Sequence, residues 1–213
     1  MDKKIKSIIV DKKLKKYEKL SKLLKYLFVE KSKISQNEYY ILGSFGIRKH
    51  RTISDLDINL DYDEFLKLRN LTQEKMGHIE FYNNQIRWVF DLTKEYNELT
   101  GENEKDFSIE AFQKKPVDGF PNKTFSLKYL VSKKSFDRDN NGHQFFNLKT
   151  LLRWKKTMNR DKDKPDIELI EKLLSKPSKI SKKTKTSKPS KISKTSKKTK
   201  TSKKTKTAKK KKK

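Results

Sequence analysis

Apolar residues recur with two different periods along the chain, and each period predicts a different element. Leucine and aromatic residues return every three or four positions over residues 11–30, which is typical of an amphipathic helix. Polar and apolar residues alternate over residues 55–60, as in a strand with one buried face. By the same criteria residues 37–42 predict a short strand and residues 61–71 a helix.

The middle of the chain predicts a β-hairpin. Residues 78–82 and 85–92 are rich in aromatic and β-branched residues and flank Asn83-Asn84, so we expect two antiparallel strands. Trp88 and Trp154 lie in apolar runs and are expected in the core. The other expected elements are a loop over residues 96–106, a short helix over 108–115, irregular chain over 117–147, and helices over 147–158 and 165–174.

Together these elements predict an α/β (α+β) fold, in which helices flank a mixed sheet. We expect one domain over residues 1–174, with an N-terminal helix (residues 11–30), a core that carries the candidate chemistry (residues 37–92) and a C-terminal helical part (residues 147–174). Three histidines, His50, His78 and His143, have no metal-ligand spacing and are expected at the surface.

Charge divides the chain into a body, residues 1–174, and a tail, residues 175–213. The whole chain has 55 Lys and Arg against 27 Asp and Glu, and the tail alone has 19 Lys and no acidic residue. The body keeps 36 basic residues, so its net charge is +9. The tail repeats SKPSKISK and SKKTKT and has almost no apolar residues, so we expect it to be disordered.

The lysine-rich tail has two interpretations. It is either a solvated extension or a segment that binds nucleic acid nonspecifically, because its charges attract phosphates. The tail has neither aromatic residues nor arginine, which argues against reading of bases. A nuclear address is a further alternative. The lysine pairs that we single out for nucleic-acid binding are Lys182, Lys183, Lys197, Lys198, Lys203 and Lys204.

Two absences in the composition restrict the class of protein. The chain has no cysteine, which excludes disulfides and a cysteine nucleophile. No stretch of about 18 apolar residues occurs, so we expect no membrane span. We therefore expect an intracellular protein, cytoplasmic or nuclear, with no membrane partner.

Candidate chemistry is concentrated between Gly43 and Asp57. The predicted strand ends at Gly43, and Gly43-Ser44 allows a tight turn whose N–H groups and hydroxyl can meet a phosphate. Asp55 and Asp57 lie two apart on the next predicted strand, so both carboxylates share one face. Neighbouring carboxylates repel unless a cation lies between them, and oxygen ligands favour Mg²⁺ or Mn²⁺.

Asp91 is the expected third carboxylate. It ends an apolar strand, and if that strand lay beside residues 55–60, Asp91 would be next to Asp55 and Asp57. Three carboxylates and a phosphate-holding turn are the components of two-metal phosphoryl transfer. The alternative is that the aspartates are solvated surface residues and that Asp91 is a strand-end residue at a turn.

The run GSFGIRKHRTISDLDINL, with Gly-Ser, ten residues and then D-L-D, resembles the nucleotidyltransferase superfamily typified by DNA polymerase beta. The sequence of this run is similar to that of the small members of the superfamily, the minimal and the antibiotic nucleotidyltransferases. The later run with Lys155, Arg160, Asp163 and Asp166 is similar to their C-terminal L-x-x-x-K…R-x-K-D-x-x-D-[ILV] element. The resemblance covers residues 40–92 and 148–174 and does not extend to residues 94–147.

The resemblance implies that Gly43 and Ser44 hold the β- and γ-phosphates of an NTP, for which ATP is the first candidate. It implies that Asp55 and Asp57 ligate Mg²⁺ or Mn²⁺, and that Asp91 binds the metal on the nucleophile side and helps to remove the proton of the attacking hydroxyl. That hydroxyl would attack the α-phosphate, and pyrophosphate would leave. Arg48, Lys155 and Lys162 are further nucleotide-binding candidates. The alternative for the two lysines is that they form ion pairs with Asp163 and Asp166 on a helix surface.

The acceptor hydroxyl is left open between a tRNA, a protein and a small molecule. A second hypothesis is a noncatalytic nucleic-acid-binding or packaging protein that acts through its basic tail. A third is an enzyme that a regulatory protein partner controls.

Overall fold

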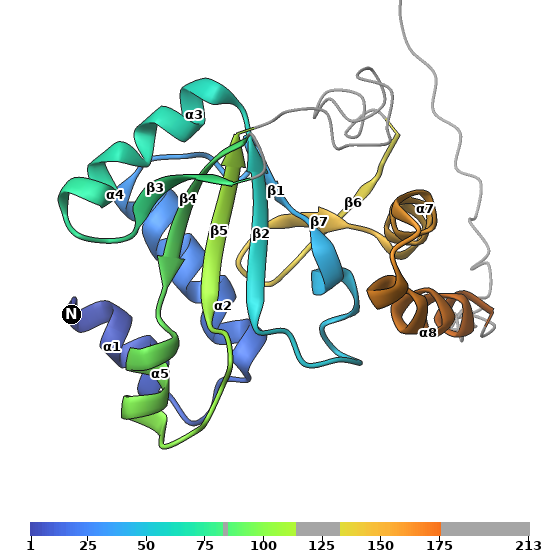
Figure 1. Ribbon diagram of the computed structural model, residues 1–213, viewed down its shortest axis with the longest axis horizontal. Helices are drawn as coiled ribbons and strands as arrows, with labels where there is room; N and C mark the ends of the chain where they lie inside the picture. The colour runs from blue at the N-terminus through green and yellow to red at the C-terminus, as the bar shows by residue number, and fades with distance from the viewer. Residues whose placement is uncertain (83–84, 114–132, 176–213) are drawn as a thin grey trace, which may run out of the picture. The chain divides into compact units, whose positions relative to one another are not determined.

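The computed structural model describes residues 1–82, 85–113 and 133–175, which belong to one compact unit, Met1–Pro177 (Figure 1). The predictions for the Asn83-Asn84 turn, for residues 114–132 and for residues 176–213 lie outside the described residues. The strands are β1 (Tyr39–Ile41), β2 (Asp55–Leu60), β3 (His78–Tyr82), β4 (Gln85–Asp91), β5 (Ser108–Gln113), β6 (Phe136–Arg138) and β7 (Gln144–Phe146).

The helices alternate irregularly with these strands. They are α1 (Lys3–Val10), α2 (Lys16–Leu24) with its π-helical continuation η1 (Lys25–Lys31), the 3₁₀ turn η2 (Gly43–Ile47), α3 (Tyr62–Lys67), α4 (Arg69–Gln73), α5 (Thr93–Thr100), α7 (Leu148–Met158), the 3₁₀ turn η3 (Asp161–Asp163) and α8 (Lys164–Ser175). No described helix is long and apolar enough to cross a membrane.

The seven strands form one mixed sheet in the order β3-β4-β5-β2-β1-β7-β6. Strand β2 is central, since it pairs with β1 antiparallel and with β5 parallel. The predicted hairpin is present as the antiparallel pair β3 and β4. Helices and a mixed sheet confirm the predicted α+β class.

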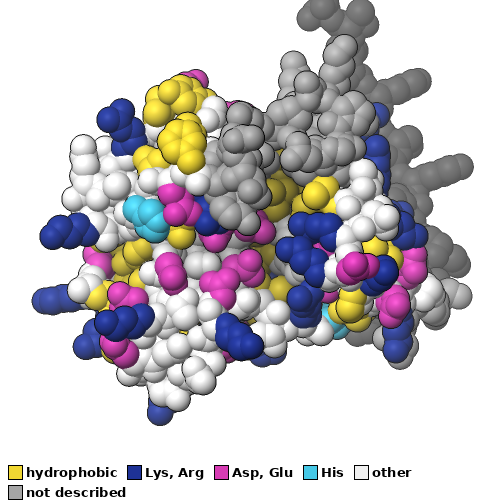
Figure 2. All heavy atoms as spheres, viewed as in Figure 1, with side chains coloured by type: hydrophobic (Ala, Val, Ile, Leu, Met, Phe, Trp, Pro, Cys, Tyr) yellow, Lys and Arg dark blue, Asp and Glu magenta, His cyan; other side chains and the backbone are white. Residues whose placement is uncertain are grey.

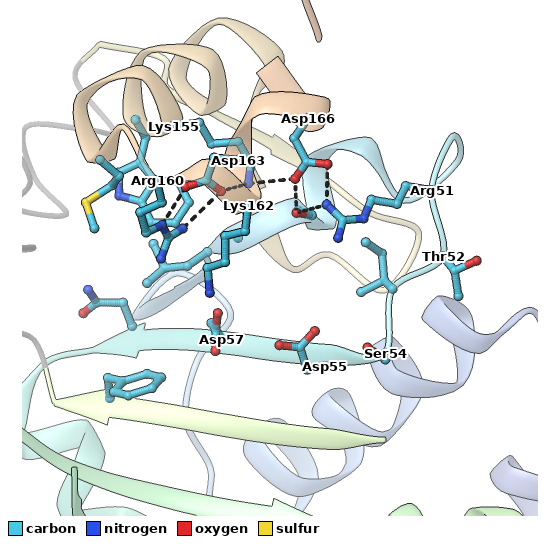
Figure 3. Close-up of a pocket in the computed structure, with 18 of the residues that line it drawn as sticks. Arg51, Thr52, Ser54, Asp55, Asp57, Lys155, Arg160, Lys162, Asp163 and Asp166 are labelled. Carbon is cyan, nitrogen blue, oxygen red and sulfur yellow. Dashed lines mark hydrogen bonds and ion pairs between the residues drawn. The ribbon is translucent and has the colours of Figure 1, made fainter. Parts of the chain in front are cut away.

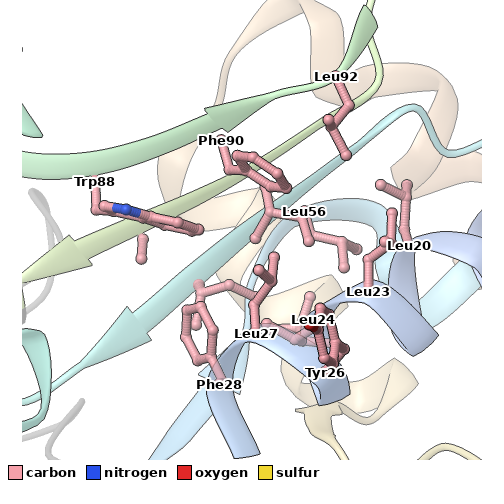
Figure 4. Packing of buried hydrophobic residues seen from close by; sticks show 14 of the residues in the cluster. Leu20, Leu23, Leu24, Tyr26, Leu27, Phe28, Leu56, Trp88, Phe90 and Leu92 are labelled. Carbon is pink, nitrogen blue, oxygen red and sulfur yellow. The ribbon is translucent and has the colours of Figure 1, made fainter. Parts of the chain in front are cut away.

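Alternation along the strands divides the sheet into two faces. Leu56 of β2 and Trp88 and Phe90 of β4 point into the main core, where they meet Leu23 and Leu27 of the α2–η1 helix (Figure 4). A second, smaller core lies under α7 and α8 and includes Tyr40, Phe146, Leu151, Trp154 and Ile170. Both tryptophans are buried, as the sequence predicted. The residues between the core residues of β2 therefore face the opposite side of the sheet.

The predicted short helix over residues 108–115 is wrong, because residues 108–113 form strand β5 between β4 and β2. Ile109 and Ala111 are buried in the main core, with Ser108 and Glu110 on the other face. This segment of six residues gains hydrogen bonds from two neighbouring strands, and these tertiary contacts override the high helix propensity of Ala and Glu.

Other predictions also need correction. Within the expected irregular chain over 117–147, residues 136–138 and 144–146 form strands β6 and β7. The sequence interpretation missed α1, whose Ile5, Ile8 and Ile9 are buried, and predicted a loop where α5 forms. The N-terminal helix begins at Lys16 rather than at residue 11. His143, expected at the surface, is fully buried and hydrogen-bonded to the Tyr39 hydroxyl and to the Ser21 carbonyl, which compensate its burial.

Candidate active site

Asp55 and Asp57 point away from the main core, toward the segment that joins α7 to α8 (Figure 3). Leu56 and Ile58 anchor β2 in the core, so the period of the strand fixes both carboxylates on the opposite face. Acidic side chains gather over the middle strands, and Lys and Arg side chains gather on the side of α7 and α8, with a hollow between them (Figure 2).

This hollow is a pocket of about 440 Å³, a size typical of small-ligand sites. Asp55 and Asp57 line one wall, while Arg51, Arg160 and Lys162 contribute cations to the others. The Gly43-Ser44 turn closes the pocket beside β1. The pocket therefore combines carboxylates that can hold a cation with cations that can hold phosphates. We call it the carboxylate pocket.

Asp57 is the most perturbed acid in this pocket. Its burial, together with the charges of Asp55 and Glu110, raises the pKa of Asp57 to about 7, although Lys162 and Arg160 oppose the rise. The Gly43 turn lies against it, since a Cβ atom on Gly43 would be 3.5 Å from Asp57 Oδ2, and the φ angle of +64° at Gly43 suits glycine. A bound cation would remove the repulsion that disfavours the charged form of Asp57.

A second group of acids in the same pocket is fully paired. Lys155 Nζ donates to Asp163 Oδ1 at 2.7 Å and to Asp166 Oδ2 at 2.8 Å, and Arg160 Nε donates to Asp163 at 2.6 Å (Figure 3). Burial acts to raise the pKa of both carboxyls, but these hydrogen bonds and charges hold each pKa below its usual value. We call Lys155, Asp163 and Asp166 the buried ion cluster.

The buried ion cluster also fixes the predicted phosphate-binding turn. Ser44 Oγ donates to Asp166 Oδ2 at 2.6 Å, and Arg51 forms an ion pair with the same carboxylate. Asp166 thus joins α8 to the turn that follows β1. The Ser44 hydroxyl is engaged with this carboxylate rather than directed at Asp55 and Asp57.

The predicted nucleotide-binding residues divide into three groups. Lys162 lines the carboxylate pocket, as do Gly43 and Ser44. Lys155 also borders it, but its side chain is 3% exposed and is held by two carboxylates, so its ion pairs are the alternative that the sequence left open. Arg48 lies elsewhere, over the rings of Phe45 and Phe145 at 4.6 and 4.2 Å, and lines a different pocket.

Asp91 does not lie beside Asp55 and Asp57, which corrects the sequence prediction. Strand β5 is inserted between β4 and β2, and Ser108 pairs with Asp91 on one side and with Asp55 on the other. Two strand spacings separate the backbones of the two aspartates, roughly 9.6 Å. Asp91 Oδ1 instead accepts hydrogen bonds from the backbone N–H and the hydroxyl of Thr93, at 2.8 and 2.6 Å, where α5 begins.

Glu110 of β5 is the carboxylate that the sequence interpretation missed. It is the register partner of Asp57 on the adjacent strand, and Arg87 Nη1 donates to its Oε2 at 2.6 Å. Burial raises the pKa of Glu110, although Arg87 opposes the rise. The signal that could have found it is the spacing of Ile109 and Ala111, which indicates a strand with Glu110 on the polar face.

The donor set fits a hard divalent cation, because two carboxylates share one face and a third lies on the next strand. Within the described residues, no three acidic or histidine side chains yet converge closely enough to hold an ion. Asp55 and Asp57 are therefore the primary candidates, and Glu110 lies one strand away.

Comparisons with models of known protein families, with curated proteins and with solved structures find no match.

Proposed function

We propose that this chain is a metal-dependent nucleotidyltransferase that moves an NMP group from an NTP to a hydroxyl acceptor and releases pyrophosphate. The observation that carries the proposal is the carboxylate pocket, in which Asp55 and Asp57 face Arg51, Arg160 and Lys162 across a volume that suits a nucleotide. The resemblance of the Gly43–Ile58 segment to nucleotidyltransferases supports the same reaction.

The basic wall would take the phosphates. Lys162 and Arg160 lower the pKa of Asp57, so their charges already act across the pocket where a triphosphate would lie. Arg51 borders both the Ser44 turn and the pocket, and a guanidinium can hold phosphate oxygens in a bidentate manner. The buried ion cluster links this wall to the Ser44 turn.

The acidic wall would hold the metal and receive the proton. Asp55 and Asp57 would hold Mg²⁺ or Mn²⁺, which when bound neutralises phosphate charge and polarises the α-phosphate. The acceptor oxygen forms a bond to the α-phosphorus, and the bond from that phosphorus to the β-phosphate oxygen breaks. Pyrophosphate leaves with the electron pair, and the hydroxyl proton passes to a carboxylate on this face, for which Glu110 with its raised pKa is suited.

The test is an NTP-transfer assay with the full chain. The chain is incubated with each α-labelled NTP, with Mg²⁺ or Mn²⁺, and with pools of tRNA, protein and small molecules. The double variant Asp55→Asn, Asp57→Asn is expected to lower transfer by at least about 100-fold, because it removes the metal ligands while it keeps their shape.

The matched control is Asp63→Asn, Asp137→Asn, which removes the same charge from exposed positions outside the pocket. Its rate should stay within about threefold of the parent chain, as is usual for surface substitutions. Equal rates for both double variants, or labelled acceptor in neither the parent nor the control, would contradict the proposal. Nucleic-acid binding without any transfer would favour the noncatalytic alternative.

A further inference from the structure

A second pocket, which we call the basic pocket, lies where the start of α2 meets the loop that leads into β2. It has a volume of about 340 Å³. Lys15, Lys16 and Tyr17 line it from the helix, and the run from Arg48 to Ile53 lines it from the loop. This loop is the segment in which the chain carries the sequence RKHR.

The charge of the basic pocket is of one sign. None of the described residues that line it is acidic, whereas five of them are Lys or Arg. Two of these cations have acidic partners outside the lining, Lys16 with Glu104 at 2.6 Å and Arg51 with Asp166. Lys15, Lys49 and His50 are exposed. Such a concave surface attracts an anion that has several charges.

Planar groups lie among these charges. The guanidinium of Arg48 lies 5.8 Å from the ring centre of Tyr17, and both residues line the basic pocket. Arg48 also lies 4.6 and 4.2 Å from the ring centres of Phe45 and Phe145, which hold it in place. Aromatic rings and arginine planes among cations are typical of surfaces that bind unstacked bases, so they favour a single-stranded nucleic acid over an acidic peptide.

The basic pocket and the carboxylate pocket border the same loop. Arg51, Thr52 and Ile53 line both. In Figure 3 the loop runs down into β2, with Arg51 turned toward Asp166 and Thr52 pointing away from it. A polymer that lies in the basic pocket therefore needs to pass only this loop to reach Asp55.

We propose that the basic pocket binds the phosphate backbone of a single-stranded nucleic acid and delivers one of its hydroxyl groups to the carboxylate pocket as the acceptor. This rests on the proposed function. The hydroxyl oxygen of the nucleic acid joins the α-phosphorus of the NTP, pyrophosphate leaves, and the proton passes to a carboxylate of the sheet. The product is a nucleic acid that is longer by one nucleotide.

The first experiment locates the binding site residue by residue on the full chain. Contacts made by the lysine-rich tail are thereby distinguished from contacts in the basic pocket. Lysine acetylation is measured residue by residue by mass spectrometry, with and without single strands of about 20 nucleotides, which exceed the usual site size. RNA and DNA of one sequence form two arms, and poly-glutamate of equal charge forms a third. The expected result is at least about threefold protection of Lys15 and Lys49 by a nucleic acid, since phosphate contacts bury these amines.

Lys6 and Lys149 are the internal controls, since both are exposed and neither lines the pocket. Their acetylation should change much less than that of Lys15 and Lys49. Protection by RNA alone, by DNA alone or by both supports the inference and identifies the sugar that is accepted. Protection by poly-glutamate alone, equal protection of all four lysines, or protection of none overturns it.

The second experiment compares Lys15→Ala, Lys49→Ala with Lys6→Ala, Lys149→Ala. The pocket variant should make the slope of log affinity against log salt shallower by about 1.4, because two single-strand phosphate contacts are lost. It should also raise KM for the nucleic-acid acceptor and leave KM for the NTP unchanged. Equal slopes for the two variants would contradict the inference.

The two proposals fail separately. If nucleic acid protects Lys15 and Lys49 but no NTP is consumed, the basic pocket is a binding site and the proposed transferase activity is wrong. If NMP is transferred to a protein or a small molecule and the lysines stay unprotected, the transferase stands and the nucleic-acid acceptor is wrong.

Discussion

Two groups of acidic residues line the carboxylate pocket, and they differ in what neutralises them. Asp163 and Asp166 are buried, and Lys155, Arg160 and Arg51 hold each pKa below its usual value. Asp57 faces Asp55 and Glu110, which help to raise its pKa to about 7. The first group has its cations within the chain. In the second group Arg87 pairs with Glu110, but none of the described Lys and Arg residues forms an ion pair with Asp55 or Asp57.

The comparison assigns a different task to each group. Buried acids that are paired with cations fix the geometry of the pocket, because loss of either partner leaves an uncompensated buried charge. Acids that repel one another are costly to the fold, and a cation from solution can relieve that cost. We therefore infer that the buried ion cluster builds the pocket and that the acids of β2 and β5 do its chemistry.

The largest expected effect comes from breaking the buried ion cluster. Lys155→Met keeps the aliphatic stem but leaves Asp163 and Asp166 without their shared cation, so unfolding free energy should fall by about 3–5 kcal/mol. Urea unfolding measures it. Lys156→Met is the matched control, since the Lys156 side chain is 54% exposed and its pair with Glu171 should contribute less than about 1 kcal/mol. Similar losses for the two variants would remove the distinction drawn here.

The next effect tests the third carboxylate. Glu110→Gln should reduce nucleotidyl transfer by roughly 100-fold if Glu110 is the proton acceptor that we propose. Its stability should change little, because the amide can still accept a hydrogen bond from Arg87. A transfer rate within about threefold of the parent chain would exclude Glu110 from the chemistry and return attention to Asp91.

The pH dependence separates the two groups further. Because the pKa of Asp57 is raised from 3.8 to about 7, the folded metal-free chain holds this proton more tightly than the unfolded chain. Asp57 therefore favours folding below about pH 4, and this contribution declines as pH rises to about 7. The stability difference between the parent chain and Asp57→Asn should change in that window. A difference that is constant from pH 4 to pH 8 would contradict it.

Mg²⁺ should reverse this loss. Mg²⁺ binds the charged form of Asp57, which is more populated at pH 8 than at pH 6. Mg²⁺ at about 10 mM should raise Tm by roughly a few degrees, and this rise should be larger at pH 8 than at pH 6. Differential scanning fluorimetry measures the rise, and Asp57→Asn should abolish it. A larger rise at pH 6 would be inconsistent with the assignment.

Asp91→Asn should have the smallest effect on catalysis. Asp91 is separated from Asp55 by β5 and accepts hydrogen bonds from Thr93 at the start of α5. Transfer should stay within about threefold, while stability falls by about 0.5–2 kcal/mol, the usual range for loss of a hydrogen bond that caps a helix start. A loss of activity comparable to that of Asp55→Asn would restore Asp91 as a metal ligand.

The sequence predicted the parts of the site that local patterns determine. Alternation over β2 placed Asp55 and Asp57 on one face, and the β3–β4 hairpin follows from its apolar strands. It could not predict which strand lies beside β2, because strand order depends on packing between distant segments. The sequence pattern predicts a helix over SIEAFQ, so Glu110 is not among the predicted carboxylates and Asp91 is.

The buried ion cluster shows a second limit. The spacing of Lys155, Asp163 and Asp166 indicated ion pairs, but not that these would be buried against the Ser44 turn. Burial depends on how α7 and α8 pack on β1 and β7, which no local pattern in the helices specifies. The sequence therefore leaves Lys155 open between a nucleotide contact and ion pairs, and the structure shows the ion pairs.

The most direct test of the central claim is a Mn²⁺ titration of the full chain at pH 7.5, followed by electron paramagnetic resonance. The account predicts saturable binding that disappears in Asp55→Asn, Asp57→Asn and persists in Asp63→Asn, Asp137→Asn. It also predicts that affinity falls by up to about tenfold per unit as pH drops below 7, because the Asp57 proton competes with the ion. Mn²⁺ binding that is the same in both double variants would contradict the claim that Asp55 and Asp57 bind the metal ion.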